Sequence, residues 1–377
     1  MQKRIIYADN AATTKLDIDA FEAMKPFLLD EYGNASQPYS FARKPKQALK
    51  EARTIIAQCI NAEPEEIFFT SGGTESDNWA IKGAAFTDFE KRAIITSQIE
   101  HHAVLRSCEE VEKLGYPVAY LPVTSEGVVT TEALSSVITP HTNLVSVMFA
   151  NNEIGTIEPI KELCEIAHQN GAIFHTDAVQ AVGHIQIDVK ALGVDMLSAS
   201  AHKFNGPKGI GFLYIKKGTS IASYASGGAQ EFGMRAGTEN VASIVGMAVA
   251  LKKNCEAINE NVEYLKTLET TLIDRLSEAG LNFVRNGSSQ HIPGNINLSF
   301  KNRDGEALLH RLDLMGICVS TGAACDTVNT QTSHVLNAIG LNQEYAQGTI
   351  RVSLGKNNVI DEIDHIITAL KSILAKR

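Results

Sequence analysis

The sequence lacks several features that would assign it to well-defined classes of protein. It has no apolar run of the roughly twenty residues that a membrane-spanning helix needs. We therefore expect no membrane insertion. Its net charge is −9 and its basic residues are scattered, so we expect no direct binding to nucleic acid either. No G-x-G-x-x-G opens a strand–turn–helix unit, which argues against a nicotinamide-dependent dehydrogenase. No H-E-x-x-H or zinc-finger spacing occurs either, and we predict no metal site.

An export signal is also missing. The first residues, "MQKRIIYADNAATT", lack the apolar stretch and the small-residue cleavage site of a signal peptide. We therefore expect a cytoplasmic protein whose six cysteines are reduced thiols. Four of them (Cys59, Cys108, Cys164 and Cys255) lie in segments with a helical pattern, where a buried structural thiol is expected.

The first 250 residues alternate apolar strand-like runs with amphipathic helical stretches. This βαβα rhythm predicts an α/β fold with a mostly parallel sheet and helices on both faces. Ligands bind at the carboxyl ends of the strands in such sheets. Five polar clusters follow predicted strands: "TSGGTES", "QIEHH", "ANNEIGT", "HTDAVQ" and "SAHK". We expect these clusters to form one site.

The rhythm changes after a long helical pattern that runs from about residue 240 to residue 278. The segments "INLSF", "GICVS" and "TIRVSLG" are predicted strands, and "GEALLHRLDLM" and the C-terminal stretch are predicted helices. This composition indicates a smaller α+β domain, with the long helix joining the two parts. We predict a large α/β domain over residues 12–257 and a small domain formed by residues 1–11 and 258–377.

Lys203 lies at the end of a predicted strand, in "SAHKFNGPKGIG". An ammonium near a core must be solvated or paired, so its position calls for a chemical reason. A lysine whose amine pKa is lowered can form a Schiff base with a cofactor aldehyde such as that of pyridoxal phosphate (PLP). Lys208 is the rival lysine, and its place within a turn favours a solvated surface side chain.

PLP also needs an acidic partner for its pyridine nitrogen and donors for its phosphate. Asp177 ends the strand "AIFHTD" and supplies a carboxylate, although an N-cap role explains it equally well. The backbone of Gly73 and Thr74 joins strand to helix and could cradle a phosphate, or form an ordinary turn. Ser200 and His202 flank the lysine and could add donors.

Three further residues have both a chemical and an ordinary interpretation. His101 ends a strand and could lie over a flat ring, or belong to a solvated pair with His102. Arg351, in "TIRVSLG", could bind a substrate carboxylate or form a salt bridge at a strand end. Cys325 follows a predicted strand among small and polar residues, typical of a loop, where many cysteines are unreactive.

Ten short motifs occur in the same order as in one known family. They are "YADNAATT", "YGNAS", "TSGGTESDN", "IEHHAVL", "NNEIGT", "HTDAVQ", "SAHKFNGPKGIG", "RAGTEN", "GAAC" and "IRVSLG". On these motifs the sequence resembles the cysteine desulfurases of the NifS/IscS type, which are class-V, fold-type-I PLP enzymes. The resemblance runs essentially end to end. It implies a large domain with a mostly parallel, seven-stranded type of sheet and a smaller α+β domain.

The resemblance also implies roles for individual residues. Lys203 would form the covalent link to PLP, and Asp177 would contact the pyridinium nitrogen. His101 would stack on the ring and assist proton transfer. The implied cofactor-binding residues are Gly73, Thr74, His101, Asn152, Asp177, Gln180, Ser200, His202 and Lys203, with Thr238 supplied by a second subunit. The implied substrate-binding residues are Asn34, Asn152 and Arg351.

Cys325 would be the nucleophile that takes sulfur from L-cysteine as a persulfide, leaves L-alanine and passes the sulfur to an acceptor protein. Two substitutions depart from the family pattern around it. Ala323 replaces the usual serine, and Asp326 places a carboxylate beside the thiol, which disfavours the thiolate. Near the N-terminus, Ala35 and Tyr39 replace the usual proline and histidine.

The sequence thus predicts a homodimeric, PLP-dependent L-cysteine desulfurase serving iron–sulfur cluster, thio-cofactor or tRNA thiolation pathways, without identifying the acceptor. Two other readings stay open. One is a different class-V PLP enzyme, such as a selenocysteine lyase or an aminotransferase. The other is a non-catalytic relative that acts as a partner protein, against which the intact Lys203, Asp177 and His101 argue.

Overall fold

Seven strands form the central sheet of the larger part of the molecule, in the order β2-β8-β7-β6-β5-β3-β4. The computed structural model describes residues 4–87, 90–321 and 332–375. Five neighbouring strands run parallel, and β8 is antiparallel to both β2 and β7. The prediction of a mostly parallel sheet is confirmed. The strands are β2 (Ile67–Thr70), β3 (Ala93–Ser97), β4 (Val118–Leu121), β5 (Thr142–Ser146), β6 (Ile173–Asp177), β7 (Met196–Ser200) and β8 (Gly211–Ile215).

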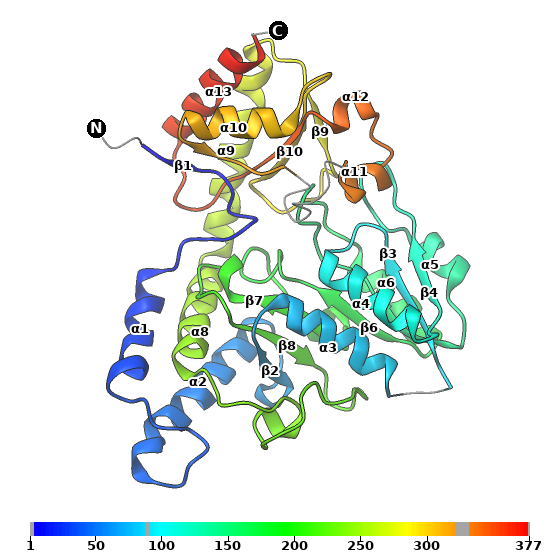
Figure 1. Ribbon diagram of the computed structural model, residues 1–377, viewed down its shortest axis with the longest axis vertical. Coiled ribbons are helices and arrows are strands. Elements are labelled where there is room, and N and C mark those ends of the chain that lie inside the picture. Colours follow the sequence, from blue (N-terminus) through cyan, green and yellow to red (C-terminus); the bar gives the residue numbers. More distant parts are fainter. Residues whose placement is uncertain (1–3, 88–89, 322–331, 376–377) are drawn as a thin grey trace.

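Helices cover both faces of this sheet (Figure 1). Successive residues of a strand point to opposite faces, so Phe68 packs in one apolar cluster with α3 and α4, while Phe69 packs in another with α2, α6 and α8. Burial on both faces explains why the strands are near-continuous apolar runs. The helices of this part are α1 (Ile18–Leu29), α2 (Arg43–Cys59), α3 (Gly73–Ala85), α4 (His102–Lys113), α5 (Thr131–Val137), α6 (Ile160–Gln169), α7 (Val189–Leu192) and α8 (Val241–Glu256), with short 3₁₀ turns at Ser40–Ala42, Pro64–Glu66, Ala201–Lys203 and Glu231–Gly233.

The smaller part is built on an antiparallel sheet of order β12-β10-β9 and on a parallel pair formed by β1 and β11. Its core joins both ends of the chain, because Ile6 packs in the same apolar cluster as Ile363 and Leu370. β1 and α13 both lie in this upper part of Figure 1. The elements are β1 (Ile6–Tyr7), α9 (Ile258–Glu278), β9 (Val284–Asn286), β10 (Asn295–Ser299), α10 (Gly305–Leu314), β11 (Ile317–Cys318), α11 (His334–Ala338), α12 (Gln343–Ala346), β12 (Thr349–Ser353) and α13 (Ile360–Leu374).

The predicted helical stretch over residues 240–278 is in fact two helices, α8 and α9, separated at Ala257. Ala257 has φ −104° and ψ 8°, outside helical values. The break follows from packing, since α8 contributes Met247 and Leu251 to the large core and α9 contributes Leu268 and Leu272 to the small one. The predicted domain boundary at 257/258 coincides with this break and stays a prediction.

The cysteines that the structure describes are free thiols. Cys108 and Cys164 are buried, as expected of structural thiols, whereas Cys59, Cys255 and Cys318 are half-buried. Within the described ranges, no helix is both long enough and apolar enough to cross a membrane.

Candidate active site

A cavity of about 370 Å³ opens at the carboxyl ends of β6 and β7 and the N-terminus of α3. This volume lies in the range of small-molecule and cofactor sites. Three of the five polar clusters predicted from the sequence supply much of its lining, and two others reach it through His101 and Asn152. The predicted residues that line it are Gly73, Thr74, His101, Asn152, Asp177, Gln180, Ser200, His202, Lys203 and Arg351.

Lys203 closes a short 3₁₀ turn directly after β7, and its side chain enters the cavity. Its ammonium donates to the backbone carbonyl oxygens of Ala11 at 2.6 Å and Ala12 at 2.8 Å. The N-terminal segment therefore crosses the cavity and holds the amine in place. Lys208, the rival lysine, is exposed and does not line the cavity.

The start of α3 forms an anion cradle. The first backbone N–H groups of a helix have no intrahelical partner, and Gly73 and Thr74 begin this thirteen-residue helix. A Cβ at Gly73 would lie 2.5 Å from Cγ2 of Val179, so only glycine lets the backbone pack so closely there. Ser200 and His202 face the same space from β7 and the turn after it. Burial lowers the pKa of His202 to about 4, so its imidazole is neutral near pH 7.

Asp177 lies at the end of β6 and is 5% exposed. Its Oδ1 accepts from the backbone N–H of Val179 at 2.9 Å, which caps a turn and not an α-helix. Burial raises the pKa of Asp177 to about 6, against the opposing effects of the Val179 N–H and of Lys203. A cationic group held against this carboxylate would favour its ionised form.

Asp77 is a second buried carboxyl group in the cavity wall, and the sequence analysis missed it. It is 1% exposed, and among the described residues its Oδ1 has no hydrogen-bond partner. Burial and the neighbouring charge of Asp177 raise the pKa of Asp77 well above its usual value. The only sequence signal was its position one helical turn after Gly73 in "GGTESD", on the same face of α3. Asp77 is therefore the harder of the two carboxyl groups to ionise.

His101 precedes α4 and lies between the cavity and the helix. Its Nδ1 accepts from the backbone N–H of Ala103 at 3.1 Å. Burial, with the charge of Lys203, lowers the pKa of His101 to about 4. A neutral imidazole whose Nδ1 accepts carries its proton on Nε2. His101 thus offers one defined N–H donor and stays uncharged near neutral pH.

Glu100, which directly precedes His101, forms hydrogen bonds that hold this loop in place. Its Oε1 accepts from the Ser97 hydroxyl at 2.7 Å and from the backbone N–H of Met148 at 2.9 Å. The side chain is fully buried, and burial raises the pKa of Glu100 to about 8. This protonated carboxyl ties the end of β3 to the segment after β5, and so fixes the loop that carries His101.

Replacing Glu100 by glutamine is expected to flatten the pH dependence of stability. The folded-state pKa lies above the unfolded value of about 4.5, so the stability linked to this group is complete below pH 4.5 and is lost as the pH rises towards 8. Between pH 5 and pH 7.5 this loss amounts to about 3 kcal/mol. Urea unfolding at the two pH values measures it. Glu112→Gln, on the exposed face of α4, is the matched control, and equal slopes for wild type and Glu100→Gln would refute the assignment.

Arg351, in β12, belongs to the smaller part of the molecule and lines the cavity. It is 5% exposed, and it donates to the backbone carbonyl of Asn152 at 2.8 Å and to the Asp9 carboxylate at 2.8 Å. The salt bridge that the sequence left open is therefore present, with Asp9 as a partner that the sequence analysis did not identify. Among the described atoms, the Nε of Arg351 is buried without a hydrogen-bond partner. The two terminal nitrogens of the guanidinium each donate one bond here, so each keeps a second N–H donor.

Gln180 also holds the N-terminal segment that contacts Lys203, because its Nε2 donates to the carbonyl of Ala11 at 3.0 Å. Its side chain lies in the wall that also holds Lys203. The implied role of Gln180 in binding the cofactor stays a prediction.

Two predicted site residues do not line the cavity of their own chain. The side-chain oxygen of Asn34 accepts from the backbone N–H of Ser36 at 2.9 Å, and Thr238 is exposed. Their segments are neighbours, since the Ser36 hydroxyl donates to Glu239 at 3.1 Å. Cys325, with Ala323 and Asp326, lies outside the described residues.

The side chains of Asp77, His101 and Asp177 each offer an atom of the kind that binds metals, all within 4.8 Å of one another. Two buried carboxyl groups beside an imidazole suit either a cation or a cationic ring. Lys203, Thr74 and Ser200 in the same cavity favour the ring, because a metal site would not need a lysine and an anion cradle.

Comparisons with known proteins agree with this geometry. The family model described as Aminotransferase class-V matches residues 6–366. Cysteine desulfurase IscS of Clostridium botulinum is 48% identical over 377 residues, which cover 99% of this chain and 95% of that protein. A solved structure of a NifS-like protein has a TM-score of 0.93 at 38% identity, covering 99% of this chain and 100% of that one. A structure of SspA in complex with cysteine has a TM-score of 0.83 at 36% identity, covering 94% and 100%.

Class-V aminotransferases and cysteine desulfurases are PLP-dependent families, which accords with a lysine, a buried carboxylate and an anion cradle in one cavity. The family model and the solved structure of the NifS-like protein each match nearly the whole chain. The chain therefore belongs to the class-V aminotransferase family and, within it, to the cysteine desulfurases of the NifS/IscS type.

Proposed function

We propose that the chain is an L-cysteine desulfurase that holds PLP on Lys203 and takes sulfur onto Cys325. L-Cysteine and the Cys325 thiol yield L-alanine and the Cys325 persulfide. The substrate C–S bond breaks, an S–S bond forms, and the methyl group of alanine gains a proton, so atoms and electrons balance. The persulfide sulfur then passes to an acceptor protein, which serves iron–sulfur cluster, thio-cofactor or tRNA thiolation chemistry.

The observation that carries the proposal is the meeting of Lys203, Asp177 and the Gly73–Thr74 helix start in one cavity. PLP, when bound, supplies an electron sink for the bonds at the substrate Cα. An aldehyde, a pyridine nitrogen and a phosphate are its three points of recognition. This cavity offers an amine, a buried carboxylate and an anion cradle of matching chemistry. Gly73, where a Cβ would meet Val179, keeps the cradle open.

The buried carboxyl groups suit a single positive charge on the ring. Burial and the neighbouring charge of Asp177 both raise the pKa of Asp77 and so oppose a second negative charge there. Asp177 would then be the carboxylate that pairs with a pyridinium nitrogen. Two ionised carboxylates would overcompensate one cation, so the protonated Asp77 sets the charge of the site.

We assign proton transfer to Lys203 and His101. The Lys203 amine would be the group that carries a proton to or from the substrate Cα. His101 stays neutral, with its proton on Nε2, and can donate to a substrate sulfur or cofactor oxygen without adding charge. The carbonyls of Ala11 and Ala12 hold the amine inside the cavity, where a bound substrate would lie.

Arg351 orients the substrate. The remaining N–H donors of its two terminal nitrogens suit the two oxygens of a carboxylate. The bonds to Asp9 and to the Asn152 carbonyl fix the plane of the guanidinium. A substrate carboxylate would share this cation with Asp9, and so lie at the junction of the two parts of the molecule.

Cys325 is proposed as the sulfur acceptor from the sequence and from its neighbours in the chain. Thr321, which lines the cavity, precedes it by four residues, and four residues span at most about 14 Å. Ser333, on the far side, donates to Glu153 at 2.6 Å, and His334 bonds to the carbonyl of Glu100 at 2.9 Å. One flank of the cysteine segment thus lines the cavity, and the other is bonded to residues that neighbour His101 and Asn152 in the chain.

We also propose a homodimer whose subunits complete each other's sites through Thr238 and Asn34. Helix α1 leaves Ile18, Leu28 and Leu29 between 56% and 69% exposed, an apolar surface that a second subunit would cover. The Arg235–Glu75 ion pair ties the Thr238 loop to α3, near the anion cradle. Light scattering is expected to give twice the chain mass, and a fully active monomer would reject the shared site.

The function is tested by supplying L-cysteine and a thiol reductant to the purified protein and measuring alanine and sulfide together. We expect equal amounts of both products and no requirement for a keto acid. Amino transfer that depends on a keto acid would identify an aminotransferase instead. Alanine formed from L-selenocysteine but not from L-cysteine would identify a selenocysteine lyase, and no product from either would leave a non-catalytic relative.

A further inference from the structure

Asp9 places a carboxylate in the active-site cavity, beside the group proposed to bind the substrate. It lines the cavity together with Arg351, Ser320 and Thr321. Its Oδ1 accepts from a terminal nitrogen of the Arg351 guanidinium at 2.8 Å. The side chain of Arg351 is 6% exposed and that of Asp9 is 19% exposed, so water screens their charges only partly. A substrate carboxylate on Arg351 would therefore lie close to a second negative charge.

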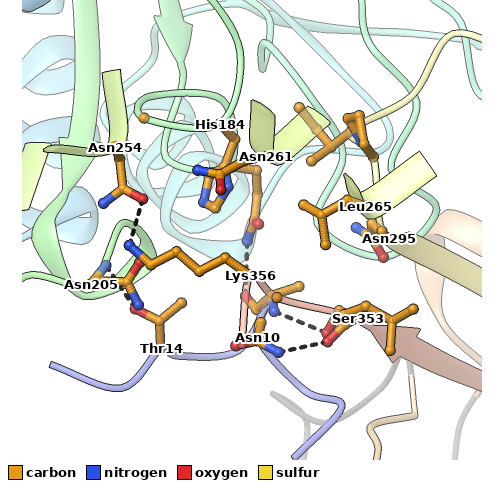
Figure 2. A pocket seen from close by; sticks show the side chains of 18 of the residues that line it. Asn10, Thr14, His184, Asn205, Asn254, Asn261, Leu265, Asn295, Ser353 and Lys356 are labelled. Atoms are coloured by element: carbon orange, nitrogen blue, oxygen red, sulfur yellow. Dashed lines mark hydrogen bonds between the residues drawn. The ribbon is translucent and has the colours of Figure 1, made fainter. Parts of the chain in front are cut away.

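The backbone on both sides of Asp9 is held against β12. Asn10 donates through its backbone N–H and its Nδ2 to the carbonyl of Ser353, at 3.1 and 2.9 Å. The Ser353 N–H donates in turn to the carbonyl of Ala8 at 2.8 Å. Figure 2 shows Asn10 beside Ser353, in the pocket behind this segment. The same strand carries Arg351, so the Asp9 carboxylate stays beside the guanidinium.

The negative charge of Asp9 acts on its surroundings in spite of this ion pair. Burial, and after it the charge of Asp9, raises the pKa of the Tyr7 hydroxyl, against a smaller opposing effect of Arg351. Burial, Asp313 and then Asp9 raise the pKa of the Cys318 thiol. Both neighbours thus resist becoming anions. An anionic group of a ligand near Asp9 would meet the same repulsion.

The cavity holds few positive charges that could offset a second anionic group. Lys203 and Arg351 are the lysine and arginine side chains of its described lining, and there are no others. Lys203 is proposed to carry PLP. His101 and His202 are neutral near pH 7, because burial lowers the pKa of each to about 4. Once a substrate carboxylate shares Arg351 with Asp9, no cation of this lining remains for another negative group.

We infer that Asp9 determines specificity, by restricting the substrate to α-amino acids whose side chain is uncharged. The inference rests on the proposed function and names the substrate class of the same site. L-Cysteine, whose thiol is neutral near pH 7, meets this restriction. L-Aspartate does not, and neither does L-cysteine sulfinate, an oxidised form of cysteine with an anionic sulfur group. Asp9 weakens the binding of any carboxylate to Arg351, but it repels a dianion twice.

The test compares the binding of propionate and succinate to the purified holoenzyme by ligand-observed NMR. Propionate has the carbon skeleton of cysteine and one carboxylate, and succinate carries a second. Neither has an amine, so neither reacts and no turnover is needed. We expect the wild type to bind succinate at least about tenfold more weakly than propionate.

Asp9→Asn keeps an oxygen that accepts from Arg351 but removes the charge. It should tighten the binding of both compounds, and that of succinate by about tenfold more than that of propionate. Asp9→Glu keeps the charge and should keep the preference for propionate. Asp274→Asn removes an exposed charge on α9, outside the cavity, and should change neither affinity. Arg351→Lys should weaken both, which locates the binding at the guanidinium.

The inference is overturned if the wild type binds succinate as tightly as propionate, if Asp9→Asn leaves their ratio unchanged, or if neither compound binds. These outcomes are independent of the proposed desulfurase activity. Alanine and sulfide formed from L-cysteine without this discrimination would keep the proposed function and reject the role of Asp9. Discrimination that Asp9→Asn removes, in a protein that forms neither product, would do the reverse.

Discussion

Replacing Lys203 by alanine is expected to abolish the covalent attachment of PLP and to lower desulfurase activity by at least about a thousandfold. In the structure the Lys203 amine lies in the cavity, held by the carbonyls of Ala11 and Ala12. No other lysine is among the residues that line the cavity in the described part of the chain. The purified wild-type protein should be yellow, and borohydride should fix the cofactor to it, whereas Lys203→Ala should release PLP on denaturation.

The matched control is Lys208→Ala. Lys208 lies five residues further on, in the same glycine-rich turn, but it is exposed and outside the cavity. It should retain the colour, the borohydride-fixed cofactor and the activity. The assignment fails if borohydride still attaches the cofactor to Lys203→Ala, or if the Lys208 variant is the one that loses it.

Cys325→Ala is expected to lose alanine and sulfide production while retaining PLP. Most of the proposed cofactor-binding residues lie on α3, β6, β7 and the turn after β7, and none of them lies in the cysteine segment. Sulfur transfer, by contrast, requires a thiolate that reaches the substrate. The variant should therefore bind PLP with wild-type affinity, measured by absorbance, and form neither product above background in single-turnover assays.

Cys318→Ala is the control for this experiment, because Cys318 lies on β11 only a few residues before Cys325. Burial raises the pKa of the Cys318 thiol, so it is a poor nucleophile near neutral pH. Its removal should leave both products unchanged. Full activity of Cys325→Ala would remove the nucleophile assignment, and loss of PLP from that variant would show that the residue supports the cofactor site.

Much of the active-site cavity could be predicted because the parallel sheet places the ends of its strands at one edge. Asp177, Ser200 and Lys203 each follow an apolar run, and this order alone brings them together. Arg351 was harder to place, since its contact with the large part depends on how β12 packs and no local pattern encodes that. The resemblance to a known family, more than periodicity, pointed to it.

Asp77 shows what sequence patterns miss. An aspartate in the first turns of a helix is ordinarily a solvated group that favours the helix dipole. Its burial comes from the packing of α3 over β6 and β7, which "TESDNWA" does not reveal. The break at Ala257 was missed for a similar reason, because the helical pattern continues on both sides while the partner core changes.

The pairing of β1 with β11 has a consequence for how the protein is made. β1 leaves the ribosome well before its partner strand, since Ile6 and Tyr7 pair with Ile317 and Cys318, and Ile6 packs in a core that also needs α13. At usual elongation rates of about 5–20 residues per second, β1 waits roughly 15–60 s for β11. The large sheet can assemble during that interval, whereas the small part closes only after α13 has been made. The junction that carries Arg351 therefore forms after the strands of the large sheet are available to pair.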